Sequence, residues 1–203
     1  MQARNSSAEQ SRTLTEQVRR AQIVSAAIST IAGLGYRNAT FAQIAKRAGL
    51  SSTGLISYHF AGKEELISEV VRTVLADIGT YMAARMKAAA SPAEALRAYI
   101  EGNVEFISSH REQMKALADI FVNGGFSYDA ADEKAVVSPL EEILAAGQAA
   151  AEFRAFDPAV MATLVQRAVD GLPFLLDVRP ELDVAAYGRE VVTVFDLATR
   201  AQP

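Results

Sequence analysis

One stretch of this chain, residues 40–63, constrains its fold more than any other: TFAQIAKRAGLSSTGLISYHFAGK. Apolar residues recur at helical spacing in its first half, and Thr40 precedes them where a helix N-cap belongs. Gly49 follows the last of them, where a left-handed backbone ends a helix at little cost. The second predicted helix is too short and too polar to be a core element alone. This pattern is typical of a helix-turn-helix, whose second helix enters the DNA major groove.

Four segments around this stretch carry a more specific pattern: Gly35-Tyr36, Thr40-Phe41-x-x-Ile44-Ala45, Ala48-Gly49-Leu50-Ser51 and Tyr58-His59-Phe60-x-x-Lys63-Glu64-x-Leu66. Together they resemble the TetR family of bacterial transcriptional regulators, over about a third of the chain. The resemblance implies an all-α protein of about nine helices. An N-terminal three-helix DNA-binding domain with a helix-turn-helix would precede a larger helical ligand-binding and dimerisation domain.

The expected domain boundaries follow from periodicity. Residues 1–13 are polar and aperiodic, which predicts a mobile tail. Residues 14–62 then form the DNA-binding domain, and residues 63–203 form the ligand-binding and dimerisation domain. In the first domain, a helix over Leu14–Gly33 carries Arg19 and Arg20 in its early turns. One of these arginines either approaches the DNA backbone or belongs to a solvated face.

Charge is divided unevenly along the chain. The net charge is −4, but residues 1–63 hold eight basic and two acidic side chains, or +6, which leaves −10 for the remainder. A basic N-terminal module on an acidic body is the electrostatic footprint of a DNA reader. The absence of cysteine excludes disulfides and thiolate metal sites and suits a cytoplasmic location. With two histidines we expect no metal site and no cofactor, and we identify neither a signal peptide nor an apolar run that could span a membrane.

The resemblance assigns phosphate contacts to four residues: Thr40, Tyr58, His59 and Lys63. Hydroxyl, phenol, imidazole and ammonium donors suit phosphate oxygens, and Lys63 also opens the following helix. Two alternatives remain open: Tyr58 as a core aromatic stacked on the first helix, and His59 as a hydrogen-bonded structural clasp.

Base contacts fall to Gln43 and to a short polar set in the second helix. Glutamine can bind adenine through two hydrogen bonds, serine and threonine accept several bases, and glycine allows close backbone approach. The chain departs from the usual family pattern here, because the segment between Gly49 and His59 is one residue longer than the commonest spacing. A serine also stands where many members carry a phosphate-binding tyrosine, so the register of the recognition helix stays open. The set comprises Ser52, Thr53, Gly54 and Ser57.

The remaining sequence predicts helices throughout. A long helix over Lys63–Ala90 would link the two domains and act as a lever arm. The further predicted helices are Pro92–Ser109, Arg111–Val122, Lys134–Glu152, Pro158–Val178 and Asp183–Thr199. The last two helices are apolar over a wider part of their circumference than packing within a single chain would bury. In the family, this pair forms a four-helix dimer interface with its mates, which implies a homodimer.

A small-molecule site is expected among the middle helices, where polar and soft side chains lie among apolar ones. Methionine and aromatic residues suit an adaptable pocket with few polar anchors. A stripe of methionine and phenylalanine at helical spacing is usually core, which is the alternative to a pocket. Asp170, Gly171 and Pro173 either kink a helix beside a pocket or allow close packing across the dimer. The candidates are Met82, Met86, Asn103, Phe106, His110, Met114, Phe121, Asp170 and Phe174.

The leading functional hypothesis is therefore a dimeric repressor that binds double-stranded DNA and is released from a palindromic operator by a small-molecule inducer. Two recognition helices would lie roughly 34–36 Å apart, one turn of DNA. The sequence does not exclude an activator. An all-helical enzyme is the second hypothesis, but neither a cysteine nucleophile nor a GxSxG motif is present, and Glu141 and Glu142 are adjacent rather than convergent. A helical adaptor without DNA binding is the third, and the retained phosphate set argues against it.

Overall fold

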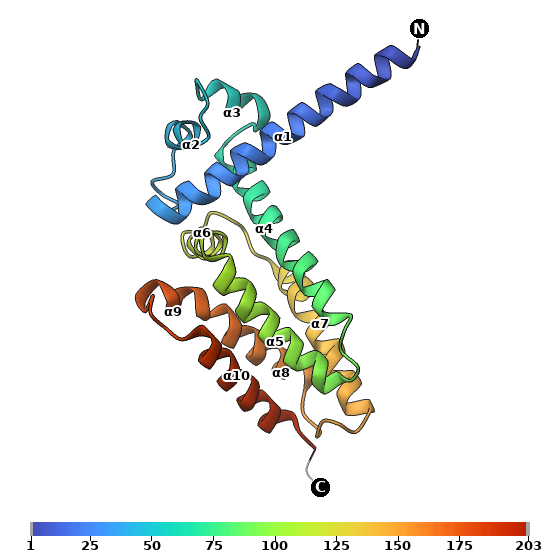
Figure 1. The fold of residues 1–203 in the computed structure, drawn as a ribbon. Helices are drawn as coiled ribbons and strands as arrows, with labels where there is room; N and C mark the ends of the chain where they lie inside the picture. Colours follow the sequence, from blue (N-terminus) through green and yellow to red (C-terminus); the bar gives the residue numbers. More distant parts are fainter. Residues whose placement is uncertain (1, 202–203) are drawn as a thin grey trace. The chain divides into compact units, whose positions relative to one another are not determined.

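The computed structural model describes residues 2–201, with side chains from residue 14 onward. Ten helices and no strand lie within this range, which confirms the all-α class (Figure 1). They are α1 (Gln2–Leu34), α2 (Phe41–Arg47), α3 (Gly54–His59), α4 (Lys63–Met86), α5 (Pro92–Ser109), α6 (Arg111–Val122), α7 (Ala130–Ala149), α8 (Pro158–Asp170), α9 (Leu172–Val178) and α10 (Val184–Thr199).

Several helix boundaries differ from those expected. Helix α4 ends at Met86 instead of Ala90, and α7 ends at Ala149 instead of Glu152. Helix α1 begins at Gln2 and so runs through residues expected to be an aperiodic tail, where Gln, Ala, Glu and Arg favour a helix. Helix α7 begins at Ala130 because the side chain of Asp129 caps its first amides. The segment expected as one helix over Pro158–Val178 is divided into α8 and α9, because Pro173 has no amide hydrogen to continue the hydrogen-bond ladder.

The chain divides into two compact units. The first contains Met1–Val74 and Ala116–Ser127, and the second contains Leu75–Lys115 and Tyr128–Pro203. Helices α4 and α6 each contribute residues to both units. The first unit extends beyond residues 14–62, since it takes in the start of α4 and the second half of α6. The expected domain boundary after residue 62 stays a prediction.

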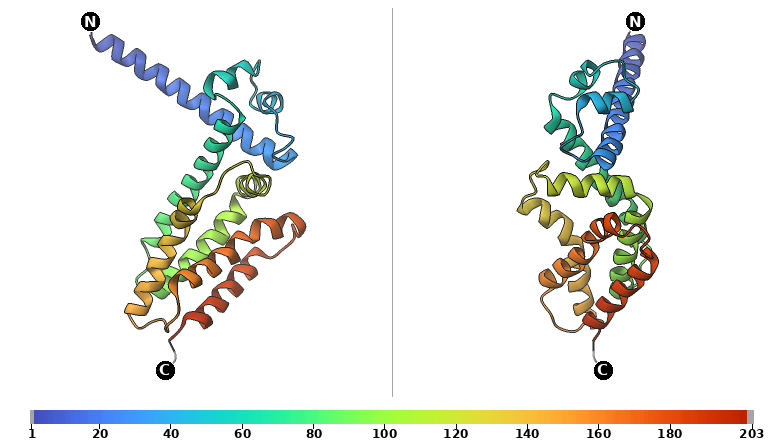
Figure 2. Two further views of the ribbon diagram at one scale, coloured as in Figure 1. Left: turned by 180° about the vertical axis from the view of Figure 1, so that it is seen from behind. Right: turned by 90° about the vertical axis from the view of Figure 1, so that its left-hand side faces the viewer.

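Each unit has its own apolar core. In the first unit, fully buried side chains from α1 to α4 include Ile23, Ile31, Ile44, Ile56, Phe60 and Leu66. In the second, α5 is the central helix, because it contacts α7, α8, α9 and α10 (Figure 2). Its core includes Leu96, Ile100, Leu140, Leu144 and Val165.

The segment Pro158–Val178 is long and apolar enough, by length and composition alone, to cross a membrane. By length and composition, the expectation that the chain contains no apolar run able to span a membrane is therefore wrong. In the fold, 39% of its most apolar window is buried, and Val165 and Leu172 are completely inaccessible to solvent. The apolar residues thus serve in part as core positions of the second unit.

A chain of polar side chains crosses the second unit. The hydroxyl of Tyr99 donates to Gln166 Oε1 (2.5 Å), and Gln166 Nε2 donates to Asp170 Oδ1 (2.7 Å). The other oxygen of Asp170 accepts from Arg167 (3.0 Å), which also donates twice to Glu133. Burial raises the pKa of the Asp170 carboxyl group. Burial, with a smaller contribution from the charge of Asp170, raises the pKa of Tyr99 to about 12.

This shift predicts a loss of stability in alkali. The folded-state pKa of Tyr99 lies above the unfolded value near 10, so its contribution is complete below about pH 10 and is lost as the pH rises to about 12. Two pKa units correspond to about 2–3 kcal/mol in the free energy of unfolding. Urea denaturation across this range should show a steeper fall for the wild type than for Tyr99→Phe. Equal slopes for the two proteins would contradict the assignment.

Candidate nucleic-acid interface

Helix α2 begins with a reciprocal cap. Thr40 has an extended backbone and its side chain accepts from the amide of Gln43 (3.3 Å), while Gln43 Oε1 accepts from the amide of Thr40 (3.3 Å). Both side chains are exposed. The Thr40 hydroxyl hydrogen remains available to a phosphate, but the glutamine oxygen is engaged. The expected two-bond reading of adenine by Gln43 therefore requires the cap to open, and a single bond from Nε2 does not.

The turn after α2 has the expected form. Gly49 has a φ of +66°, and the amide of Leu50 returns to the carbonyl of Ala45 (2.9 Å). This left-handed residue ends α2 and directs the chain into α3. Ile56, which is completely buried, fixes α3 on the unit.

The outer face of α3 carries the residues expected to contact bases. Thr53 caps the helix without a side-chain hydrogen bond, and its side chain is exposed together with those of Ser52 and Ser57. Residue 57 is four positions from residue 53 and three from residue 54, so Ser57 is a neighbour of each of them on the surface of α3. All four predicted base-contacting residues in α3 and just before it are therefore exposed, and their contact with bases stays a prediction.

Tyr58 and His59 have different environments. The ring of Tyr58 is 72% exposed, which excludes the alternative of a core aromatic, and its hydroxyl lies 3.5 Å from Glu16 Oε1. The half-buried ring of His59 packs edge-on against it, with ring centroids 5.0 Å apart. Both rings thus lie next to the face of α3, and the phenol hydroxyl can reach a phosphate.

Lys63 has a structural role that the sequence did not reveal. Its ammonium group donates to the carbonyl of Tyr36 (2.8 Å) and lies 4.4 Å from the centre of the Tyr36 ring. The side chain is half-buried. An ammonium group has three donors, so contact with a phosphate remains compatible with this bond. Lys63 therefore also fixes the connection between α1 and α2.

Two residues of α1 were missed as supports of this surface. The guanidinium of Arg20 donates to the carbonyl of His59, lies 4.2 Å from the centre of the Phe60 ring and is 3.7 Å from Glu65. Gln22 donates to the carbonyl of Ala48 (2.7 Å) at the end of α2. Arg20 precedes the buried Ile23 and Val24 by one helical turn, and this spacing is the signal that places it on the inner side of α1.

The nine predicted ligand residues do not converge on a described pocket. Phe121 belongs to the first unit, and the other eight belong to the second. Met82 and Phe106 are buried in the core, and the Phe106 ring stacks on His110 with centroids 4.0 Å apart. Phe174, in contrast, is 48% exposed. Met86 and Met114 are half-buried against the core, Asn103 donates to the carbonyl of Tyr99, and Asp170 belongs to the polar chain described above.

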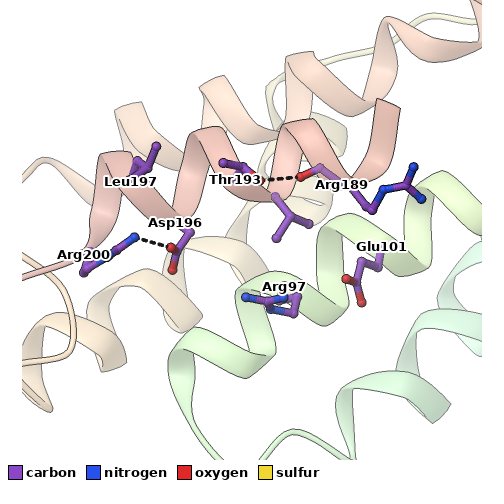
Figure 3. Close-up of a pocket in the computed structure, with 8 residues that line it drawn as sticks. Arg97, Glu101, Arg189, Thr193, Asp196, Leu197 and Arg200 are labelled. Carbon is purple, nitrogen blue, oxygen red and sulfur yellow. Dashed lines mark hydrogen bonds and ion pairs between the residues drawn. The ribbon is translucent and has the colours of Figure 1, made fainter. Parts of the chain in front are cut away.

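One groove of about 280 Å³ lies between α5 and α10 (Figure 3). Its lining is mainly charged: Arg97 and Glu101 from α5, and Arg189, Asp196 and Arg200 from α10. Arg200 donates to Asp196 (2.7 Å). None of the nine predicted ligand residues lines it. Across the part of the chain with described side chains, no three His, Asp or Glu residues lie close enough to hold a metal ion.

The class defined by this fold is an all-helical protein with a helix-turn-helix unit at its N-terminus. Residues 23–70 match the family described as bacterial regulatory proteins, tetR family. The HTH-type transcriptional regulator BetI 1 of Chromohalobacter salexigens is 40% identical over 99 residues, which are 48% of each chain. BetI of Cronobacter sakazakii is 38% identical over 108 residues, 52% of this chain and 53% of that protein. The chain spans about half the length of the curated relatives that it matches.

Solved structures extend the similarity of fold to most of the chain. A ketosteroid transcriptional regulator of Mycobacterium tuberculosis superposes with a TM-score of 0.73 at 22% identity, over 91% of this chain and 96% of that one. AibR, in complex with isovaleryl coenzyme A and operator DNA, gives 0.75 at 19%, over 87% and 97%. At such identities the match concerns the fold alone. The match to the tetR family of bacterial regulatory proteins thus covers residues 23–70, within the helix-turn-helix unit.

Proposed function

We propose that this protein is a cytoplasmic, ligand-responsive transcriptional regulator that binds a palindromic operator as a homodimer and is released by a small-molecule inducer. The observation that carries the proposal is the exposed polar face of α3, fixed from within by Ile56 and supported by the capped α2. The relatives named above are transcriptional regulators, which supports the same reading.

In this proposal the phosphates are bound by Thr40, Tyr58, His59 and Lys63, and the bases by α3 and Gln43. The exposure of Tyr58 and of the α3 hydroxyl groups supports this division. Hydrogen bonds to phosphates set the position of a reader on DNA, whereas contacts to base edges select the sequence.

The homodimer is supported by an apolar surface on the last three helices. These side chains are between 48% and 74% exposed and follow helical spacing along α8, α9 and α10. A two-fold axis would place identical surfaces against one another, and so cover them. They are Val160, Leu164, Phe174, Val178, Val194 and Leu197.

An inducer site in the second unit is supported by its mixture of polar and apolar groups. Asp170, Asn103 and His110 provide polar atoms among methionine and phenylalanine side chains. AibR is described with both a coenzyme A ester and operator DNA, so this fold accommodates both kinds of partner. An inducer lowers operator affinity only to the extent that it binds the two states of the protein differently.

The first test is fluorescence anisotropy on the DNA upstream of the protein's own gene, titrated across salt concentrations. Wild-type affinity should fall steeply with salt, because neutralised phosphates release counterions. Tyr58→Phe should weaken binding about three- to tenfold through loss of one hydrogen bond, with an unchanged salt slope because no charge is removed.

Tyr128→Phe, which changes an exposed tyrosine of the second unit, serves as the matched control and should bind as the wild type does. Weak binding by the wild type, with no salt dependence, on both this DNA and a random-sequence pool would overturn the proposed function. Equal affinities for wild type and Tyr58→Phe would remove Tyr58 from the phosphate set.

A further inference from the structure

The turn between α1 and α2 is held by a residue from outside the three N-terminal helices. The carboxylate of Asp119, in α6, accepts a hydrogen bond from the backbone amide of Tyr36. Asn123, the first residue after α6, orients this carboxylate by donating to its other oxygen (2.9 Å) and to the Asp119 carbonyl (2.9 Å). Tyr36 lies four residues before Thr40, where α2 is capped.

The backbone that follows α6 touches the same tyrosine. Gly124 ends the helix with a φ of +67°, and Gly125 then lies so close to Tyr36 that a Cβ there would be 2.6 Å from two atoms of the ring. Contacts this short do not occur between real side chains, so only glycine fits at position 125. The ring and the amide of Tyr36 are thus both defined by α6 and its end.

The opposite side of Tyr36 is held by Lys63, whose ammonium group binds the Tyr36 carbonyl and lies over the ring. One residue therefore connects α6 to two members of the phosphate set: Thr40 through the chain and Lys63 through direct contact. Removing the Asp119 side chain leaves the Tyr36 amide without its hydrogen-bond acceptor. The turn that positions Thr40 and Lys63 is then less constrained.

We propose that Asp119 is a positioning residue for DNA binding, which acts through Tyr36 to set the turn that places Thr40 and Lys63. This inference rests on the proposed function and adds a residue of α6 to its machinery. Because α6 starts at Arg111 in the second unit, operator affinity depends on a helix that both units share.

The test compares full-length Asp119→Ala, Asp119→Asn and wild type by anisotropy across salt, each corrected for its active fraction by stoichiometric titration. Asp119→Ala should bind about tenfold more weakly, with the wild-type salt slope, because Asp119 meets no phosphate. Asp119→Asn should recover binding to within about threefold, since its amide oxygen still accepts from Tyr36 and Asn123 still donates to the carbonyl of residue 119, while only the Asn123 bond to the side chain is lost. Amide exchange at Tyr36 should be faster in Asp119→Ala than in Asp119→Asn.

Gly125→Ala perturbs Tyr36 from the other side and should also weaken binding about tenfold, which keeps the test available if Asp119→Ala does not fold. Gly79→Ala, in open space on α4, and Asp77→Ala, which loses an exposed bond from Gln113, are the matched controls and should leave affinity unchanged. Wild-type affinity in Asp119→Ala and Gly125→Ala, beside a wild type that binds, would overturn the inference alone. A wild type that binds no DNA would overturn the proposed function with it.

Discussion

Leu164→Glu combined with Leu197→Glu is expected to convert the protein into a monomer and to lower its affinity for a palindromic operator about a hundredfold or more. The two side chains, on α8 and α10, are 54% and 65% exposed. In the proposed dimer each would lie against a copy of itself or its neighbour, where a buried, unpaired carboxylate is costly. The affinity falls because two linked half-sites bind 10²–10⁴-fold more tightly than one.

The monomer should remain folded, since neither side chain belongs to the core of the second unit. Sedimentation velocity would measure the mass, and anisotropy would compare the full palindrome with a single half-site. The double variant should bind the half-site as the wild type does. This result separates loss of dimerisation from loss of DNA binding by the helix-turn-helix unit. Ala145→Glu with Ala149→Glu adds the same charge to an exposed part of α7 and should leave the dimer intact. A persistent dimer in Leu164→Glu/Leu197→Glu would place the interface elsewhere.

Local sequence signals predict helix boundaries well where capping residues are present. Both bounds of α5 and α6 agree with the expectation, because Ser91 caps α5 ahead of Pro92 and His110 interrupts the ladder between the two helices. The signal fails at α8 and α9, where a continuous apolar stripe suggested one helix and the proline chemistry of Pro173 decided otherwise.

Local sequence patterns did not predict the long-range contacts that hold the helix-turn-helix in place. Lys63 meets Tyr36 across 27 positions of sequence, Arg20 meets His59 across 39, and Asp119 meets Tyr36 across 83. The residue types were visible, but a lysine or aspartate on a helix carries no sign of which distant carbonyl or amide it will bind. The family resemblance supplied the phosphate set without these supports.

The ligand set shows a different limit. Helical spacing of methionine and aromatic residues predicts an inward-facing stripe, and it does not distinguish a packed core from the wall of a pocket. Met82 and Phe106 are core residues, whereas Phe174 on the same list is exposed. Only the packing of several helices together decides between these outcomes, and single-helix periodicity contains no such information.

Gly147→Ala is expected to lower the free energy of unfolding of the second unit by roughly 3 kcal/mol or more, at the upper end of the cost of overpacking a core. A Cβ at this position of α7 would lie 2.1–2.8 Å from three ring atoms of Phe153. That ring is only 7% exposed and packs in the core. Urea denaturation would measure the loss, with Gly79→Ala as a control that should be neutral or slightly stabilising because its Cβ meets open space.

The expected cost of Gly147→Ala is large because the backbone around Phe153 is held in place, so its ring cannot move away from α7. The amide of Phe153 bonds to the carbonyl of Gly147 (3.1 Å), and the amide of Arg154 bonds to the carbonyl of Thr199 (2.9 Å), so this segment is fastened to both α7 and the end of α10. Phe153→Leu removes the clashing ring and should lower the cost of Gly147→Ala, giving a coupling of about 1 kcal/mol or more in a double-mutant cycle. Additive effects would mean that the ring can turn away within the core, so that the clash with Phe153 does not set the cost of Gly147→Ala.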